Sequence, residues 1–351
     1  MSAKNAALSS IHKFPWKWYL TDLAKIEKNG MNVFSCFSCG GGSSMGYKLA
    51  GFNVIGNCEI DPRVNALYQK NLHPRYSYEM DIRAFVDYDD LPEELYNLDI
   101  LDGSPPCSVF SMAGKREDGW NKKKVFREGQ AEQKLDDLFF YFIKLAKRLQ
   151  PKIVVAENVK GLVLGNAKGY VNEIFKAFDD AGYAVQLFLL NAAVMGVPQK
   201  RERCFFIARR KDLQIPKLTL AFNETPIFFG EVRSPEGKEL SGFAAELLAH
   251  KKQSDKTIAD ISKRVRGKDI GFNNYILYDN RVANTLASGG TFYRHCDGKE
   301  LSDEDYRNMQ AFPQDYDFGS QPVKYVCGMS VPPVMMAHVA DAIFNQWLRG
   351  E

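Results

Sequence analysis

Between residues 31 and 210 the chain alternates short β-rich runs with amphipathic stretches, and this alternation restricts the fold more than any other feature. Strands that alternate with helices predict βαβ units, which form one mainly parallel sheet covered by helices. We therefore expect an α/β, doubly wound, Rossmann-like domain. The expected strands are 32–37, 52–60, 98–103, 152–159, 183–192 and 203–210, and the expected helices are 43–51, 62–72 and 134–149.

Beyond about residue 211 the pattern changes. Residues 211–280 are polar and weakly periodic, and residues 250–268 contain seven Lys or Arg against two Asp. Such a basic run is either a solvated helix face or a surface that binds phosphate, and the pattern alone leaves both open. Residues 325–348 are again apolar and helical.

Composition excludes several classes of protein. Of the 351 residues 45% are hydrophobic and 25% are charged, which is typical of a soluble globular protein, and a net charge of +3 identifies no partner. We find no apolar run long enough to span a bilayer and no secretory signal at the N-terminus. Seven cysteines without framework spacing indicate a reducing cytoplasm, and the Cys36–Cys39 pair is interpreted as small buried residues rather than a metal site.

Two short segments suggest a ligand site. Three glycines, Gly40–Gly42, separate a predicted strand from a predicted helix, so that a ligand can approach the backbone closely at the carboxyl edge of the sheet. Glu59 ends the next strand, where an acidic group commonly binds ribose hydroxyls. The spacing is neither GxGxxG nor that of a phosphate-binding loop, and these residues alone would fit a nicotinamide enzyme nearly as well.

A third segment, "GSPPCSVFS" at residues 103–111, places Cys107 directly after two prolines at the end of a predicted strand. Proline fixes its own φ and restricts the preceding residue, so the turn is stiff before any fold is considered. A stiff turn suits a nucleophile and also suits a plain structural turn. The local pattern does not decide between them.

Six motifs then follow one another in a fixed order: "FSCGGGSSMG", "GSPPCSVFSMAGK", "AENVKGL", "GVPQKRERCFFIA", "RVANTLASGG" and "GMSVPP". In this order they resemble the cytosine-5 DNA methyltransferases, from about Asn32 to the C-terminus. The resemblance implies an S-adenosylmethionine-dependent methyltransferase fold. It also implies a catalytic domain of residues 1–210 plus 325–351 and a smaller target-recognition domain of residues 211–324.

The resemblance implies a role for each catalytic residue. Cys107 is the covalent nucleophile, which adds to carbon 6 of cytosine so that carbon 5 can attack a methyl group, and thiolates suit this step. Glu157 contacts ring nitrogen 3, Arg203 holds the exocyclic oxygen, Arg201 contacts phosphate and Asn158 orients the site. A carboxylate that ends an apolar strand is costly unless it is paired or used, which favours a function for Glu157 independently.

The implied cofactor is S-adenosylmethionine. The positions that match its contacts are Phe37, Gly40, Gly41, Gly42, Glu59, Ile60, Asp81, Pro106, Leu138, Ser330 and Val331. The chain departs from the family pattern at four positions. Ser35 stands where the family usually has an acidic residue on the first strand, and Cys39 stands where it has the first loop glycine. Ser108 takes the place of a glutamine, and Met329 takes the place of an asparagine.

The implied partner is double-stranded DNA with the target cytosine flipped out of the helix, because its reacting atoms cannot be reached in a stacked duplex. The predicted DNA contacts are Lys115, Arg116, Lys263, Arg264, Arg266 and Thr285. We expect no metal and a monomer. The expected location is the cytoplasm of a prokaryote or phage-infected cell, at the nucleoid, with any cognate restriction endonuclease acting separately.

Three other functions were considered. Amino-methyltransferases share a similar "SPP" start, but they need an aromatic residue where this chain has Cys107. The tRNA-methylating branch of the family carries a Cys-Phe-Thr motif that residues 211–280 lack. A DNA-binding module with an inactive catalytic domain would not need the complete set of Cys107, Glu157 and Arg203.

Overall fold

A computed structural model describes residues 12–106, 137–164, 168–271 and 274–350. The chain divides into two compact units. The sheet unit comprises Lys25–Leu190, Glu202–Ala221 and Met336–Glu351, and the small unit comprises Met1–Ala24, Asn191–Arg201 and Phe222–Met335. These boundaries differ from those expected from the sequence: residues 1–24, 191–201 and 325–335 lie in the small unit, and residues 211–221 lie in the sheet unit.

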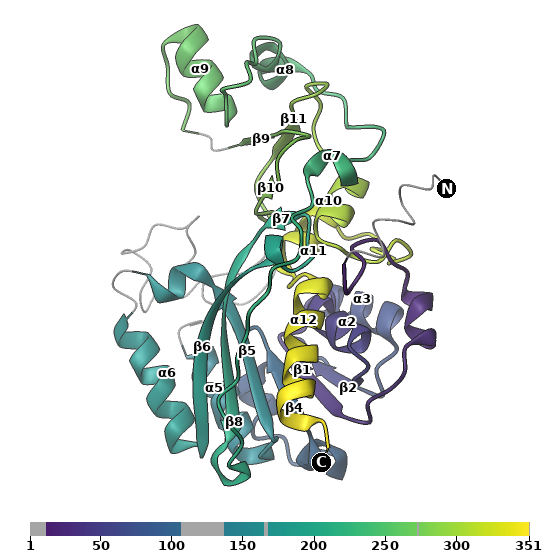
Figure 1. The fold of residues 1–351 in the computed structure, drawn as a ribbon, viewed down its shortest axis with the longest axis vertical. Coiled ribbons are helices and arrows are strands. Elements are labelled where there is room, and N and C mark those ends of the chain that lie inside the picture. The colour runs from purple at the N-terminus through teal and green to yellow at the C-terminus, as the bar shows by residue number, and fades with distance from the viewer. Residues whose placement is uncertain (1–11, 107–136, 165–167, 272–273, 351) are drawn as a thin grey trace. The chain divides into compact units, whose positions relative to one another are not determined.

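A seven-stranded sheet forms the centre of the sheet unit (Figure 1). In spatial order its strands are β3 (Tyr76–Tyr78), β2 (Asn53–Cys58), β1 (Asn32–Cys36), β4 (Ile100–Gly103), β5 (Ile153–Val159), β8 (Glu202–Arg210) and β6 (Tyr183–Asn191). The first five strands, from β3 to β5 in this order, are parallel to one another, and β8 runs antiparallel to β5. The prediction of a mainly parallel α/β sheet is confirmed, and β3 is an additional strand.

Alternate residues of the central strands face opposite sides of the sheet. Phe34 of β1 and Leu101 of β4 belong to a large apolar cluster with the helices α5 and α6. The neighbouring residues Ser35 and Asp102 point to the other side, where α2 lies, because side chains alternate along a strand. The helices with residues in the sheet unit are α2 (Gly42–Leu49), α3 (Pro62–Leu72), α4 (Ile82–Phe85), α5 (Leu138–Leu149), α6 (Lys168–Asp180) and α12 (Pro333–Ile343).

The start of α3 follows the sequence closely. Asp61 precedes the helix, and its carboxylate accepts a hydrogen bond from the Arg63 backbone N–H at 2.9 Å. Pro62 occupies the first helical position, where its missing N–H costs nothing. The predicted helix over residues 62–72 is therefore confirmed. The predicted helix over residues 134–149 is confirmed from Leu138 onward, since residues 134–136 lie outside the described residues.

The small unit contains short elements around two apolar clusters. Its helices are α7 (Phe229–Val232), α8 (Gly242–Leu248), α9 (Ile258–Arg266), α10 (Asp303–Met309) and α11 (Val323–Met329), and its strands are β7 (Gln199–Lys200), β9 (Tyr275–Leu277), β10 (Ala283–Asn284) and β11 (Phe292–Arg294). Neighbouring residues of β9 enter different clusters: Leu277 packs with Phe229 and Phe292, and Ile276 packs with Ile261 of α9. One strand thus joins both parts of the core.

Short helical turns complete both units: 3₁₀ turns at Leu20–Lys25, Glu93–Asn97, Lys160–Val163, Ala192–Val194 and Lys211–Leu213, and a π-helical turn at Phe344–Leu348. One helical run, Val323–Leu348, is long and apolar enough to cross a membrane by length and composition, contrary to the sequence expectation. However, 83% of its apolar 18-residue window is buried inside the protein, as in the core helix of a globular domain.

Candidate active site at the carboxyl edge of the sheet

Most of the predicted site residues of the sheet unit follow the carboxyl ends of parallel strands. Phe37 comes directly after β1, Glu59 after β2, Asp81 shortly after β3 and Pro106 after β4, while Glu157 lies near the end of β5. The carboxyl ends of parallel strands meet at one edge, which is where open α/β sheets bind their ligands. The topology therefore brings these residues to a common edge.

Glu157 and Arg203 form the centre of this edge. The Arg203 Nε atom lies 2.9 Å from Glu157 Oε1, and the two side chains are only 13% and 11% exposed. They belong to adjacent antiparallel strands, β8 and β5, in which Val159 pairs with Arg203. The pairing explains how a carboxylate is tolerated at the end of an apolar strand: its charge is compensated by a guanidinium held at hydrogen-bonding distance.

The chain leading to Cys107 is fixed by contacts from three sides. Asn158 Nδ2 donates to the Pro105 carbonyl oxygen at 2.9 Å, and the Ser104 N–H donates to the Cys36 carbonyl at 3.4 Å. A Cβ atom at Gly103 would lie 2.5 Å from the Phe142 ring, so only glycine fits there. Asn158 thus orients the Pro-Pro turn. Cys107 itself, with Lys115 and Arg116, lies outside the described residues.

Five of the six other cysteines make poor nucleophiles. Burial raises the pKa of the Cys36 thiol well above its usual value, and burial together with the nearby Glu59 carboxylate raises the pKa of Cys58. Cys204 and Cys327 are buried as well. The exposed Cys296 also has a raised pKa, because of desolvation and the carboxylates of Asp279 and Asp297. Because the thiolate is the reactive form, none of these thiols resembles an activated cysteine.

The glycine loop adopts an unusual backbone. Phe37, Cys39 and Gly41 all have positive φ values, of 52°, 45° and 83°. The φ of Gly41 favours glycine, and a Cβ atom there would lie 2.4 Å from Leu72 Cδ1, so a larger residue would also have to displace the Leu72 side chain. Gly40 and Gly42 flank it, and Gly42 begins α2. The loop therefore leaves β1 and enters α2 through a tight, left-handed path.

Glu59 and Ile60 directly follow β2; the first is acidic and buried, and the second is apolar and exposed. The Glu59 carboxylate is buried and accepts hydrogen bonds from the Cys39 N–H at 2.8 Å and the Asp61 N–H at 3.0 Å. Desolvation raises its pKa above the ordinary value. Ile60, by contrast, is 37% exposed and presents an apolar side chain at the same edge. The pair offers an acceptor for hydroxyl groups beside an apolar surface.

Asp81 and Leu138 lie at the starts of two helices. The Asp81 carboxylate accepts from the Arg83 N–H at 2.8 Å, as an N-cap of α4, and Leu138 is the first residue of α5 and is buried. The Arg83 guanidinium lies 2.9 Å from Asp81 and 2.8 Å from Asp137. This arginine therefore joins the two helix starts at the edge of the sheet.

Asp102 is a site residue that the sequence analysis missed. Its buried carboxylate accepts hydrogen bonds from Ser35 Oγ and Ser43 Oγ, both at 2.8 Å, and from the Tyr47 hydroxyl at 3.4 Å. These donors come from β1 and α2, while Asp102 itself immediately precedes the Gly-Ser-Pro-Pro-Cys turn. The signal was present in the sequence: Ser35 stands where the family carries an acid, and "LDILDG" places an acid on the neighbouring strand instead.

Burial raises the pKa of Asp102 from 3.8 to about 7, because the hydrogen bonds from Ser35, Ser43 and Tyr47 only partly offset desolvation and the charge of Glu157 raises it further. Between pH 4 and 7 the native protein therefore holds a proton that the unfolded chain has released. It follows that the free energy of unfolding decreases as pH rises through this window, by about 4 kcal/mol from this group.

We expect Asp102→Asn to remove this component, because an amide does not titrate in this range. Urea unfolding at pH 5, 6, 7 and 8 should show a shallower pH dependence for Asp102→Asn than for the wild type. Asp87→Asn, which changes an exposed carboxylate, should leave the profile unchanged. Parallel profiles for the wild type and Asp102→Asn would show that Asp102 is ionised throughout.

Arg201 differs from its expected role. Its guanidinium is buried and donates to the carbonyl oxygens of Leu286 at 2.9 Å, Gly328 at 2.9 Å and Ser330 at 3.0 Å. It holds segments of the small unit together, and a phosphate contact would require breaking these bonds. The Ser330 carbonyl oxygen also accepts a hydrogen bond from Gln310 Nε2 at 2.6 Å, and the next residue, Val331, is buried. The cofactor contacts of Ser330 and Val331 stay a prediction.

The predicted DNA contacts of the small unit are partly engaged within it. Arg264 lies 2.6 Å from the buried carboxylate of Asp255, and Arg266 lies 2.8 Å from Glu246. Lys263 of the same helix has no ion pair among the described residues. The Thr285 hydroxyl donates to the Lys200 carbonyl at 2.6 Å. Two of the three cations predicted to contact DNA from α9 are thus compensated internally, which weakens the case for α9 as a phosphate-binding surface.

Within the described residues, no group of three His, Cys, Asp or Glu side chains could hold a metal ion.

The sheet and the residues at its edge define a Rossmann-like methyltransferase fold, and comparisons with known proteins identify the family. The model of the C-5 cytosine-specific DNA methylase family matches residues 31–345. The chain therefore belongs to this family.

Relatives in sequence and structure agree with this assignment. The chain is 38% identical over 192 residues to Type II methyltransferase M.NgoPII of Neisseria gonorrhoeae, covering 53% of this chain and 50% of that protein. It is 27% identical over 337 residues to Type II methyltransferase M1.HphI of Haemophilus parahaemolyticus, covering 90% and 87%. The match to M.NgoPII thus spans about half of that relative's length. Spodoptera frugiperda DNMT2 shares the fold, with a TM-score of 0.60 and 16% identity over 90% of this chain and 100% of that one.

Proposed function

We propose that the chain transfers a methyl group from S-adenosylmethionine to carbon 5 of a flipped-out cytosine in a specific double-stranded DNA sequence. The observation that carries this proposal is the buried Glu157–Arg203 pair, whose atoms lie 2.9 Å apart at the end of β5. Asn158, the next residue, holds the carbonyl of Pro105, two positions before Cys107. An acid, a cation and a thiol are what addition to a pyrimidine ring requires.

The residues at the strand edge fit S-adenosylmethionine. The tight path at Gly41 brings backbone close to the sheet edge, Glu59 supplies a carboxylate for ribose hydroxyls, and exposed Ile60 supplies an apolar surface for the adenine ring. Phe37, Asp81, Pro106 and Leu138 follow or begin neighbouring elements at the same edge. When bound, this cofactor supplies the methyl group.

In the proposed mechanism the Cys107 thiolate adds to carbon 6 of cytosine, and a carbon–sulfur bond forms while the ring electrons shift toward nitrogen 3. Glu157 contacts nitrogen 3 through a proton or hydrogen bond, which stabilises the charge that develops there. Arg203 keeps Glu157 in place and contacts the exocyclic oxygen of the base. Once carbon 5 carries the methyl group, the proton on carbon 5 passes to solvent water. The electrons of that carbon–hydrogen bond form the double bond between carbons 5 and 6 while the bond from carbon 6 to sulfur breaks, which releases the Cys107 thiolate and restores the aromatic ring.

The substrate follows from this chemistry. A cytosine inside a duplex cannot present carbon 6 to a thiol, so the base must leave the stack, which costs a few kcal/mol. We assign target recognition to the small unit, since its segment 222–280 lies between two of the family motifs and is polar and weakly periodic, unlike them. The partner is duplex DNA in the cytoplasm. We propose that the protein acts as a monomer, as the methyltransferase of a restriction–modification system.

A bacterial host without cytosine methyltransferases tests the proposed function. Expression of the chain followed by conversion sequencing of the genome should show methylated cytosines at one recurring DNA sequence. The same host expressing Cys107→Ala is the control and should show none. A genome indistinguishable from that of the empty-vector host, despite soluble protein, would argue against DNA as the substrate.

A further inference from the structure

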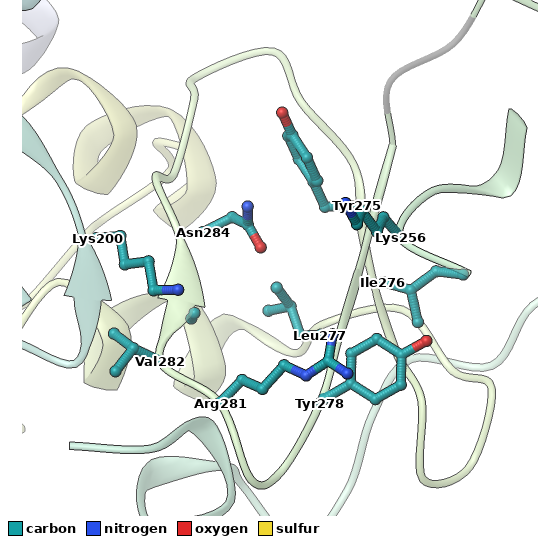
Figure 2. Close-up of a pocket in the computed structure, with 10 residues that line it drawn as sticks. Lys200, Lys256, Tyr275, Ile276, Leu277, Tyr278, Arg281, Val282 and Asn284 are labelled. Carbon is teal, nitrogen blue, oxygen red and sulfur yellow. The ribbon is translucent and has the colours of Figure 1, made fainter. Parts of the chain in front are cut away.

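One pocket in the small unit has no role in the chemistry described above. It has a volume of about 200 Å³ and is lined by residues of β7, β9 and β10 and of the segments beside them (Figure 2). Its lining residues are Lys200, Lys256, Tyr275, Ile276, Leu277, Tyr278, Arg281, Val282, Ala283 and Asn284. Three of them are cations and none is acidic. The pocket is therefore suited to an anion.

The three cations are not neutralised within the protein. Lys200, Lys256 and Arg281 are exposed, and none forms an ion pair among the described residues. The carboxylates near them in sequence pair with other cations: Asp255 with Arg264 at 2.6 Å, Asp279 with Arg233 at 3.1 Å and Glu202 with Lys160 at 2.9 Å. Asp260 accepts the backbone N–H groups of Lys256 and Thr257 and caps α9. Arg264 and Arg266 differ from these three cations, because each of the two arginines has a carboxylate partner within 3 Å.

The pocket is built by the core of the unit. β7 and β10 pair in parallel, so that Asn284 lies opposite Lys200. Arg281 lies over the ring of Tyr278, with its guanidinium carbon 4.4 Å from the ring centre. Tyr278 is buried in the cluster that includes Ile276. Cations fixed in this way lose less conformational freedom on binding than cations on a free loop.

Polar and aromatic groups complete the pocket. Figure 2 shows the amide of Asn284 directed toward the open centre, with the amine of Lys200 on one side and the guanidinium of Arg281 below it. Tyr275 is 37% exposed, and its ring stacks at 6.2 Å on that of Phe292. Neutral amide and aromatic groups beside several cations are typical of surfaces that contact both the backbone and the bases of nucleic acids.

We infer that this pocket is where the small unit contacts the phosphates of duplex DNA, through Lys256 and Arg281 with Lys200 beside them. The helix α9, which the sequence favoured, contributes less because Arg264 and Arg266 are committed to internal ion pairs. This inference rests on the proposed function, since it specifies where that substrate binds. Phosphate contacts give affinity and position without base preference.

The test is a salt series with a fluorescently labelled mixed-sequence DNA duplex of 30 base pairs and the full chain. For Lys256→Gln/Arg281→Gln we expect weaker binding at every salt concentration. The slope of log K against log salt should be shallower by about 1.8 units, since each lost phosphate contact removes about 0.9. Lys17→Gln/Lys238→Gln removes two charges of the same unit from residues that do not line the pocket, and its slope should equal that of the wild type. Thermal melting by circular dichroism verifies that each variant is folded.

The possible results distinguish a failure of the proposed function from a failure of the proposed phosphate contacts in the pocket. If the wild type binds no DNA duplex, the proposed function fails. If it binds but Lys256→Gln/Arg281→Gln keeps the wild-type slope, only the pocket is wrong. A slope lowered instead by Lys263→Gln/Arg264→Gln/Arg266→Gln would place the phosphate contacts on α9. Loss of tRNA binding with DNA binding retained would also overturn the inference, because the pocket would then bind RNA.

Discussion

Replacement of Cys107 by alanine is expected to abolish the covalent complex and to lower turnover by about 10³-fold or more, as loss of a covalent nucleophile commonly does. One physical reason is that five of the six other cysteines are buried or have a raised pKa. Cys36 and Cys58 are buried with raised pKa values, and exposed Cys296 is surrounded by carboxylates that disfavour its thiolate.

The complex can be observed with a DNA duplex that carries 5-fluorocytosine at the target position. Fluorine at carbon 5 cannot leave as a proton does, so the wild-type protein should stay attached and migrate more slowly on a denaturing gel. Cys296→Ala, which removes an exposed thiol of the small unit, should form the complex like the wild type. An undiminished complex with Cys107→Ala would mean that another residue attacks the ring.

Glu157→Gln should lower turnover by roughly 10² to 10⁴, the usual effect of losing an acid–base group. The amide keeps an oxygen for the hydrogen bond from Arg203, so that the fold of the β5–β8 edge is retained, but it no longer supplies a carboxylic proton to nitrogen 3. Binding of S-adenosylmethionine should change little. The measurement is the single-turnover methylation rate together with calorimetric cofactor affinity.

Glu202→Gln is the matched control for this variant. Glu202 lies one residue from Arg203 but is directed to Lys160, 2.9 Å away, with 40% of its side chain exposed. Its substitution should leave the methylation rate near the wild-type value. A collapse of cofactor affinity in Glu157→Gln, with normal turnover of the complex that still forms, would indicate a structural role for Glu157.

The sheet could be predicted because each of its strands has a recognisable local residue pattern. Runs such as "KIVVAENV" are almost fully apolar, as strands covered on both faces must be, and the Asp61-Pro62 start defines α3 by itself. The antiparallel direction of β8 was not predictable in this way. Strand direction depends on how the chain returns to the sheet, which its local residue pattern does not record.

The site residues that belong to ordered sequence motifs were predicted. Those that are recognised by their neighbours in the folded structure were missed. Glu157 and Arg203 belong to motifs with fixed spacing, and the structure brings them within 2.9 Å. The sequence shows Ser35 in place of an acid and an acid in "LDILDG", but only the pairing of β4 with β1 brings Asp102 to Ser35, which is 67 residues away. The internal pairing of Arg264 with Asp255 likewise arises from tertiary contacts across a loop.

The most direct test of the proposed reaction is the identity of the methylated base. The purified chain should be incubated with S-adenosylmethionine and an unmethylated duplex made by polymerase chain reaction, and the DNA digested to nucleosides for chromatography and mass spectrometry. The proposal predicts 5-methyl-2′-deoxycytidine, absent from the Cys107→Ala reaction. The appearance of N4-methyl-2′-deoxycytidine or N6-methyl-2′-deoxyadenosine in its place would contradict attack by carbon 5 and, with it, the covalent role of Cys107.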